Sequence, residues 1–329
     1  MTSPDLPAEL KAALDAKLQG VSLNEAAGRA ALISQTYRRG GSSMAIRTAA
    51  DALAYALARM PATYAAVSAC LNALCEIRPD FAPRSLLDAG AGPGTVSWAA
   101  AEALPSLKDF TLIDANSALR TLALDLGRNS HRLQGMEYQH GEALTALAAA
   151  EPADFVVASY MIGEIVDAGQ AELAERLWSR TRDTLLVVEP GTPTGYTRII
   201  ALRARLIALG AHVAAPCPHD GKCPLQAPDW CHFTQRLPRL RAHKQLKGAD
   251  LPFEDEKFSY VALTRSPSLQ RPARVLAQPV VNKAEIRAKL CTASGISIAA
   301  IPRRNKTSYQ RFKKISWGDA VFSESNGTE

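Results

Sequence analysis

Three cysteines lie close together in the second half of the chain, at Cys217, Cys223 and Cys231, with five and seven residues between them. The prolines and glycine around them favour a segment that folds back on itself, so that the thiols can converge. Thiolates are soft ligands that suit both zinc and iron–sulfur clusters. The paired Cys-x2-4-Cys spacing of zinc fingers is absent, and wider loops suit a larger iron–sulfur cluster better, with zinc as the alternative.

A fourth metal ligand must come from elsewhere in the chain. Cys291 is the predicted ligand, and His219, His232 and Cys75 are the possible substitutes. Cys70 and Cys75 lie in an alanine- and leucine-rich helical stretch, where buried thiols ordinarily only pack. Four thiolates on one metal centre would couple metal binding to the folding of this region.

A glycine-rich turn, Asp88-Ala-Gly90-Ala-Gly92-Pro-Gly94, lies well upstream of the cysteines. An apolar run precedes the turn and a helical pattern follows it, so we expect it to connect a strand to a helix. Glycines there let backbone amides approach a ligand without an intervening Cβ atom. Dinucleotide-binding proteins and class I S-adenosylmethionine-dependent methyltransferases share this pattern.

Three details favour S-adenosylmethionine. The motif opens with an acid at the strand end, and Pro93 removes a backbone donor that a pyrophosphate would use. Asp114 ends the next strand, 26 residues after Asp88, where its carboxylate can accept the ribose hydroxyls. The unit stands alone, and Ser159 ends a later strand at the same rim. The predicted cofactor-binding residues are Asp88, Gly90, Gly92, Gly94, Asp114 and Ser159.

The segment after that later strand offers the only candidates for catalysis. Tyr160 and Glu164 could bind a base, but core packing or helix capping explains them equally well. The segment lacks the Asn/Asp-Pro-Pro-aromatic motif of amino-group methyltransferases and contains no cysteine nucleophile. Catalytic residues are therefore not assigned beyond these two weak candidates.

The elements that must position these residues follow from the apolar periodicity. Residues 1–80 are predicted to form a helical N-terminal region, because leucine and alanine recur at four-residue spacing. Short apolar runs then alternate with helical stretches, which predicts an α/β fold with a mostly parallel, doubly wound sheet. Strands are expected at 85–88, 110–114, 154–159, 184–189 and 258–263, and helices at 95–104, 118–129, 171–182 and 196–209.

The predicted domains are a helical region at 1–80, a methyltransferase-like, Rossmann-like domain at 81–265 and a C-terminal β extension with a basic tail at 266–329. The cysteine-rich, metal-binding loop 216–240 is an insertion in the second of these domains. The residues from Phe322 onward are predicted to be disordered.

Charge is distributed unevenly along the 329 residues, although the net charge is only +6. Residues 1–230 carry 20 Lys and Arg against 24 Asp and Glu, whereas residues 231–317 carry 18 against 5. Such an excess is typical of a surface that meets a phosphate backbone, and a solvated basic face is the alternative. We therefore expect a nucleic acid as a partner.

Composition also excludes several classes of protein. No apolar run of 18 residues is free of charged residues, so a membrane span is not expected. The N-terminus is acidic where a targeting leader would be basic, which predicts a cytoplasmic protein with reduced thiols. We expect a monomer.

Six segments together resemble the Rsm-type methyltransferase-like proteins of the small ribosomal subunit, which occur in mitochondria and bacteria. The segments are Arg59-Met-Pro61-Ala-Thr63-Tyr, Asp88 to Gly94, Val188-Glu189-Pro190-Gly191, Cys217 to His232, Leu290-Cys291-Thr and Trp317-Gly318-Asp319. The resemblance implies a class I methyltransferase-like fold and action on small-subunit ribosomal RNA. It also implies a [4Fe-4S] cluster on Cys217, Cys223, Cys231 and Cys291.

Three functions remain open at this stage. The first is an enzyme that methylates small-subunit RNA, with S-adenosylmethionine on the glycine turn and the RNA on the basic third of the chain. The second is a non-catalytic assembly factor in which cofactor and cluster serve as structural elements. The third is a redox or zinc-dependent module whose thiolate centre responds to iron supply or oxidation.

Overall fold

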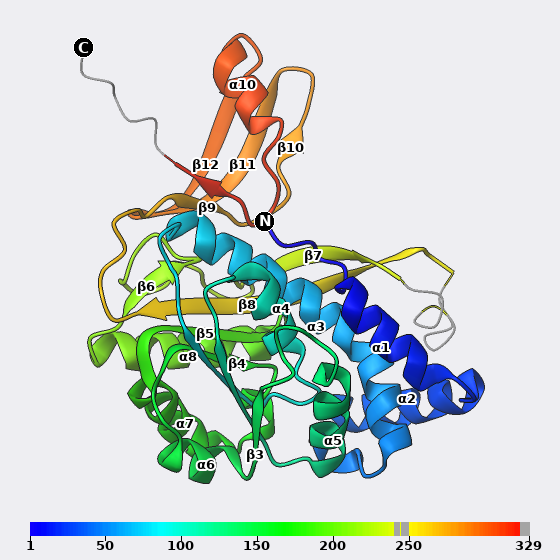
Figure 1. Cartoon of the computed structure of the whole chain (residues 1–329). Coiled ribbons are helices and arrows are strands. Elements are labelled where there is room, and N and C mark those ends of the chain that lie inside the picture. The colour runs from blue at the N-terminus through cyan, green and yellow to red at the C-terminus, as the bar shows by residue number, and fades with distance from the viewer. Residues whose placement is uncertain (240–243, 245–249, 323–329) are drawn as a thin grey trace.

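The computed structural model describes residues 1–239, 244 and 250–322. Figure 1 shows a body in which helices cover a large twisted sheet, and a second, small sheet that projects from it. The N-terminal helices lie along one side of the body. The contacts among the helices, the large sheet and the small sheet decide where the candidate sites lie.

Three helices form the N-terminal region, namely α1 (Ala8–Leu18), α2 (Leu23–Arg38) and α3 (Ala49–Ile77). Helix α3 is the longest, with 29 residues, and most of its side chains are buried. It packs against α2, against the helices α4 (Thr95–Ala103) and α5 (Ser117–Gly127), and against the strand β8 (Phe253–Thr264). Cys70 lies in the hydrophobic core that α3 forms with its neighbours, and Cys75 packs against that core, as predicted. None of the described helices combines the length and the hydropathy that a membrane span requires.

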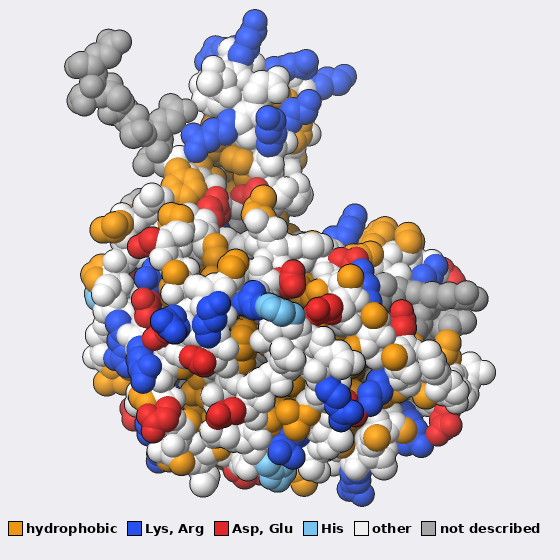
Figure 2. All heavy atoms as spheres, viewed as in Figure 1, with side chains coloured by type: hydrophobic (Ala, Val, Ile, Leu, Met, Phe, Trp, Pro, Cys, Tyr) orange, Lys and Arg blue, Asp and Glu red, His pale blue; other side chains and the backbone are white. Residues whose placement is uncertain are grey.

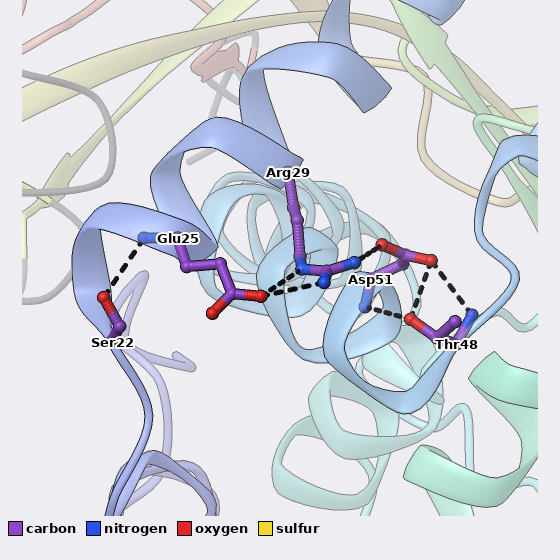
Figure 3. Close-up of polar contacts among 5 residues, drawn as sticks. All are labelled: Ser22, Glu25, Arg29, Thr48 and Asp51. Atoms are coloured by element: carbon purple, nitrogen blue, oxygen red, sulfur yellow. Dashed lines mark hydrogen bonds and ion pairs between the residues drawn. The ribbon is translucent and has the colours of Figure 1, made fainter.

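A polar clamp joins α2 to the start of α3 (Figure 3). The Thr48 hydroxyl accepts a hydrogen bond from the Asp51 amide at 3.1 Å, and the Asp51 carboxylate accepts one from the Thr48 amide at 3.0 Å. This capping box satisfies backbone donors that the first turn of a helix leaves free. Arg29 of α2 donates to Asp51 at 2.7 Å and to Glu25 at 2.8 Å, so one guanidinium connects the two helices.

The large sheet has the strand order β3-β2-β1-β4-β5-β8-β6, and β7 pairs with β8. Strands β1 to β5 run parallel, whereas β8 is antiparallel to β5, β6 and β7. The strands are β1 (Ser85–Ala89), β2 (Asp109–Asp114), β3 (Glu137–His140), β4 (Ala153–Ser159), β5 (Thr181–Pro190), β6 (His212–Ala215), β7 (Phe233–Pro238) and β8 (Phe253–Thr264). The central strands are apolar on both sides because helices cover both faces.

Two hydrophobic cores lie on the two faces of this sheet. One core packs the N-terminal helices with α4 and α5, and the other packs α7 and α8 with part of α6. The helices are α4 (Thr95–Ala103), α5 (Ser117–Gly127), α6 (Ala143–Ala149), α7 (Asp167–Ser179) and α8 (Pro193–Ala208). The sheet and its crossovers therefore place the carboxyl ends of the parallel strands at one edge.

The second sheet is antiparallel and has the order β10-β11-β9-β13, with β12 paired to β11. We call residues 273–321, which contain this sheet and α10, the basic lobe. Its core is small and consists mainly of Val275, Ile286, Leu290 and Phe312. The elements are β9 (Ala273–Val275), β10 (Val280–Val281), β11 (Glu285–Thr292), β12 (Gly295–Pro302), α10 (Lys306–Phe312) and β13 (Ala320–Val321).

The structure differs from the predictions in several places. The segment expected as a basic tail forms α10 and β13, because Phe312 packs into the core of the lobe. The expected cysteine-rich loop 216–240 contains β7, and its last residue lies outside the described part of the chain. Strand β3 was not predicted because only one of its side chains is buried. The disorder expected from Phe322 onward falls on residues 323–329, which lie outside the described part, and on Phe322, which is described.

Candidate functional site

The glycine turn connects β1 to α4 and is held against the end of β2. The amides of Gly90 and Ala91 both donate to the Ile113 carbonyl, at 2.8 and 3.0 Å. Gly90 has a φ of +68°, and a Cβ atom built there would lie 2.6 Å from Cβ of Met161. A larger residue at this position would therefore meet both backbone strain and a steric clash.

Asp114 ends β2 and ties the glycine turn to the loop before α5. One carboxylate oxygen accepts the Gly92 amide at 2.9 Å and the other accepts the Asn116 amide at 2.7 Å. Burial raises the pKa of Asp114, although both amides favour the ionised form. Each oxygen retains a lone pair, so the carboxylate can hold the turn and still accept a ligand hydroxyl.

Asp88, at the start of the motif, is fully buried beneath the turn. One of its oxygens accepts the Ser97 hydroxyl at 3.0 Å, and the other has no hydrogen-bond partner among the described residues. Burial raises the pKa of Asp88 to about 7. Its side chain thus connects the strand that precedes the turn to Ser97 in the helix that follows it.

A cavity of about 210 Å³ opens at the carboxyl ends of β1, β2 and β4. Four of the predicted cofactor-binding residues line it, namely Gly90, Gly92, Asp114 and Ser159. The other two, Asp88 and Gly94, are not among the lining residues, and Gly94 instead precedes the first residue of α4 in a left-handed conformation. The sequence thus brings four of the six to one cavity.

The segment between α2 and α3 closes one side of this cavity. The amide and the hydroxyl of Ser43 both donate to the Glu164 carboxylate, at 2.9 and 2.8 Å. The Asn116 side-chain amide donates to the carbonyls of Ser43 and Ile46, at 2.8 and 2.9 Å. We call residues 42–46 the flap. Glu164 lines the cavity, and its carboxylate is engaged in holding the flap.

Tyr160, the other catalytic candidate, lines the same cavity with a left-handed backbone conformation, φ 56°. Its hydroxyl donates to Glu256 of β8 at 3.0 Å, and Arg59 of α3 donates to the same oxygen at 3.1 Å. Burial raises the pKa of Tyr160. Arg59 and Glu256 were not predicted as site residues, and only the position of Arg59 in a family-like segment signalled it.

A second cavity brings together the four predicted metal ligands. Cys217, Cys223, Cys231 and Cys291 all line it, although Cys291 belongs to β11 of the basic lobe and the others to the loop between β6 and β7. The Tyr196 hydroxyl donates to Sγ of Cys223 at 3.2 Å. Burial raises the pKa of Cys291 to about 12 and also raises the pKa of Cys217 and Cys231.

The substitute ligands are placed differently. Nε2 of His219 lies 3.8 Å from Sγ of Cys291, whereas the ring of His232 stacks on Trp230 at 4.9 Å. Cys75 lines another cavity, beside Glu76. Among the residues that the structure describes, no group of three or more His, Cys, Asp or Glu side chains forms a closed metal site. The four thiols share a cavity without closing on one point.

Comparison with known proteins assigns the chain to a family. A family model described as mitochondrial small ribosomal subunit Rsm22 matches residues 49–322. The human protein named ribosome assembly protein METTL17, mitochondrial, is 28% identical over 289 residues, which cover 82% of this chain and 62% of that protein. Rsm22-cox11 tandem protein 2, mitochondrial, of Schizosaccharomyces pombe is 24% identical over 319 residues, which cover 81% of this chain and 42% of that protein. The chain spans less than two thirds of the length of these relatives.

Solved structures resemble the chain more distantly. Magnesium protoporphyrin IX methyltransferase from Synechocystis PCC 6803, with bound SAH, has a TM-score of 0.41 and 12% identity, covering 62% of this chain and 84% of its own. Precorrin-6y C5,15-methyltransferase from Geobacter metallireducens GS-15 has a TM-score of 0.39 and 14% identity, covering 59% of this chain and 84% of its own.

The strand order of the large sheet, with β8 antiparallel beside β5, is that of a class I methyltransferase-like, Rossmann-like fold. The N-terminal helices and the antiparallel basic lobe are additions to that fold. The resemblance inferred from the sequence is confirmed, because the family model matches well over half of the residues. This chain belongs to the Rsm22 family.

Proposed function

We propose that this protein binds the RNA of the small ribosomal subunit and promotes assembly of that subunit. Family membership and the names of the relatives support the partner. The observation that carries the proposal is the basic lobe, on which Figure 2 shows Lys and Arg side chains gathered at the projecting end of the molecule. Its exposed basic residues are Lys283, Arg287, Arg303, Arg304, Lys306, Arg311, Lys313 and Lys314.

The lobe has the charge that phosphate binding requires. Within residues 273–321 the sequence carries ten Lys and Arg but only Glu285 and Asp319 as acids. Basic side chains that neutralise phosphates release counterions, so the affinity falls steeply as salt rises. Binding through the lobe should therefore be strongly salt-dependent and only weakly dependent on RNA sequence.

The test is RNA binding by a charge-depleted lobe. The triple variant Arg303→Gln, Arg304→Gln, Lys306→Gln should bind small-subunit RNA at least about tenfold more weakly at 0.1 M salt and give a shallower salt dependence. A matched variant with Gln in place of the exposed arginines Arg128, Arg182 and Arg205 loses the same charge from the body. Equal binding by the two variants contradicts a role for the lobe.

The four cysteines, we propose, hold a [4Fe-4S] cluster, with zinc as the alternative. Thiolates are the required donor set, and the four sulfurs share one cavity. A single zinc ion would draw its sulfurs to about 2.3 Å from one point, whereas a cluster holds them farther apart. The spacing of the cysteines along the chain, which lacks the paired Cys-x2-4-Cys of zinc fingers, favours the cluster.

Anaerobic purification distinguishes the two metals. A cluster gives visible charge-transfer absorbance and iron in the metal analysis, whereas zinc gives no colour. Cys223→Ser should abolish the bound metal, and Cys75→Ser, which alters a cysteine outside the cavity, should retain it. Metal retention by Cys223→Ser contradicts the proposed ligand set.

The cavity at the glycine turn supports a further proposal, the binding of S-adenosylmethionine. Gly90 and Gly92 would accommodate the cofactor closely, Asp114 would accept its ribose hydroxyls, and Ser159 would lie beside it. Asp88 and Gly94 would act by shaping the turn. Gly92→Arg should abolish cofactor binding in equilibrium dialysis, because the side chain would enter the cavity.

Methyl transfer to small-subunit RNA is the second candidate function, and the cofactor cavity is the observation that favours it. Tyr160 and Glu164 are both engaged in structural hydrogen bonds, which supports an assembly role without catalysis instead. Rescue of a deletion strain decides between the two. If Gly92→Arg restores subunit assembly as well as the wild type, methyl transfer is not required.

The cytoplasmic location and the monomeric state remain predictions from the sequence.

A further inference from the structure

Two buried arginines face the cavity of the four cysteines. Arg203 of α8 is 3% exposed and Arg274 of β9 is 2% exposed, and both line this cavity. In the register of the second sheet, Arg274 lies directly opposite Cys291. Burying a guanidinium is costly unless an anion or a complete set of acceptors compensates the charge.

The acceptors that surround these guanidiniums are neutral. Arg203 donates to the His219 carbonyl at 2.7 Å, and its Nε has no partner within the described part of the chain. Arg274 donates to the carbonyls of Pro216 and Gly318, at 3.2 and 2.9 Å. Neither side chain forms an ion pair with a carboxylate in the described part of the chain. The charge of Arg274 only opposes the rise that burial causes in the pKa of Glu76. The hydrogen bonds alone leave two positive charges uncompensated.

We propose that Arg203 and Arg274 are the counter-charges of a four-thiolate metal centre in this cavity. A zinc ion and an oxidised [4Fe-4S] core each carry two positive charges, and each would be bound by four singly charged thiolates. The whole centre therefore has a net charge of about −2 in either case. Two guanidiniums balance that charge. This inference rests on the thiolate centre proposed above, but it holds for either metal.

The arginines would thus stabilise the metal-loaded protein specifically. Replacement of Arg203 by Met keeps a long side chain but removes the charge, so metal retention should fall while the metal-free protein loses little. A role limited to the His219 carbonyl would instead weaken both forms equally. If the centre is a cluster, loss of a nearby positive charge disfavours its reduced form. A tenfold shift of that equilibrium toward the oxidised form corresponds to about 59 mV for one electron.

The experiment compares melting temperatures of metal-loaded and metal-free protein, and metal release to a chelator, for the wild type, Arg203→Met and Arg203→Lys. We expect Arg203→Met to reduce the difference in melting temperature between the metal-loaded and the metal-free protein, and to release metal about tenfold faster. Arg203→Lys should restore most of that temperature difference and slow metal release again. Arg132→Met is the control, because Arg132 donates to the carbonyls of Ala101, Leu104 and Leu107 in another part of the molecule. It should lower both melting temperatures equally.

Two outcomes overturn the inference for different reasons. If the wild type holds metal and Arg203→Met lowers both melting temperatures equally, or releases metal at the wild-type rate, the arginine is structural and only this inference is wrong. If the wild type holds no metal under anaerobic conditions, the thiolate centre is wrong and the inference falls with it. Arg274→Met, in the other sheet, carries the same comparison should Arg203→Met not fold.

Discussion

At the scale of single residues, Asp88 has an acid–base property that can be measured. Its carboxyl is buried with one unpaired oxygen, and burial raises its pKa to about 7, above the value of about 3.9 in the unfolded chain. Ionisation of this buried carboxyl therefore lowers the free energy of unfolding. The loss is absent below about pH 4, grows as the pH rises toward 7 and is complete above it. Asp88→Asn should remove this cost and be more stable than the wild type at pH 8.

Urea unfolding between pH 4 and 9 checks this prediction. The free energy of unfolding of the wild type, relative to Asp88→Asn, should fall with pH by up to about 1.4 kcal/mol per unit. Asp109→Asn, at the exposed start of β2, is the control and should leave the pH dependence unchanged. If the free energies of unfolding of the wild type and Asp88→Asn change with pH in the same way, the pKa of Asp88 is not raised.

At the scale of elements, the capping box at the start of α3 supports the helix on which Arg59 is carried. Thr48→Ala removes the hydroxyl that accepts the Asp51 amide, so the free energy of unfolding should fall by about 1 kcal/mol. Thr48→Ser retains the acceptor and should lose much less. Chemical denaturation of the two variants measures the difference, and equal losses would assign the effect to the lost methyl group.

The flap gives a prediction about local opening. Asn116→Asp keeps an acceptor for the cap of α5 but removes both side-chain hydrogen bonds to Ser43 and Ile46. Trypsin should then cleave after the exposed Arg47 about fivefold faster or more, because one lost hydrogen bond of about 1 kcal/mol already changes opening by that factor. Asn305→Asp, which keeps the cap of α10 and does not contact the flap, should be cleaved there at the wild-type rate.

These elements also show which features the sequence could predict. The glycine turn and the end of β2 at Asp114 were predictable because local periodicity and spacing determine them, and β1 ends at Ala89, one residue beyond the predicted end at Asp88. The Tyr160–Glu256 contact was not predictable, because it joins residues 96 positions apart, one after β4 and one on β8, and local patterns do not relate these two strands. The flap was missed for the same reason, since Ser43 meets Glu164 across 121 positions.

At the scale of the whole molecule, the cysteine loop, which is the segment 216–232 between β6 and β7, connects the body to the basic lobe. We call this connection the joint. Two ion pairs cross this joint without any metal. Asp220 of the cysteine loop pairs with Arg271, just before the lobe, at 2.7 Å, and Asp229 pairs with Lys289 of β11. Such half-exposed pairs are individually weak and are screened by salt. A thiolate centre that takes Cys291 from the lobe would add a connection that salt does not weaken.

Metal removal should therefore loosen the lobe, and more so at high salt. Amide hydrogen exchange in residues 216–232 and in β9 and β11 should speed up by about tenfold or more when the metal is removed, because the ordering of that region is coupled to metal binding. Exchange in β1 and β4 should not change, since these strands lie at the centre of the large sheet. Raising the salt from 0.1 to 1 M should accelerate exchange at the joint in the metal-free protein much more than in the loaded one. If the exchange rate in β11 changes neither on metal removal nor with salt, hydrophobic contacts alone hold the basic lobe in place.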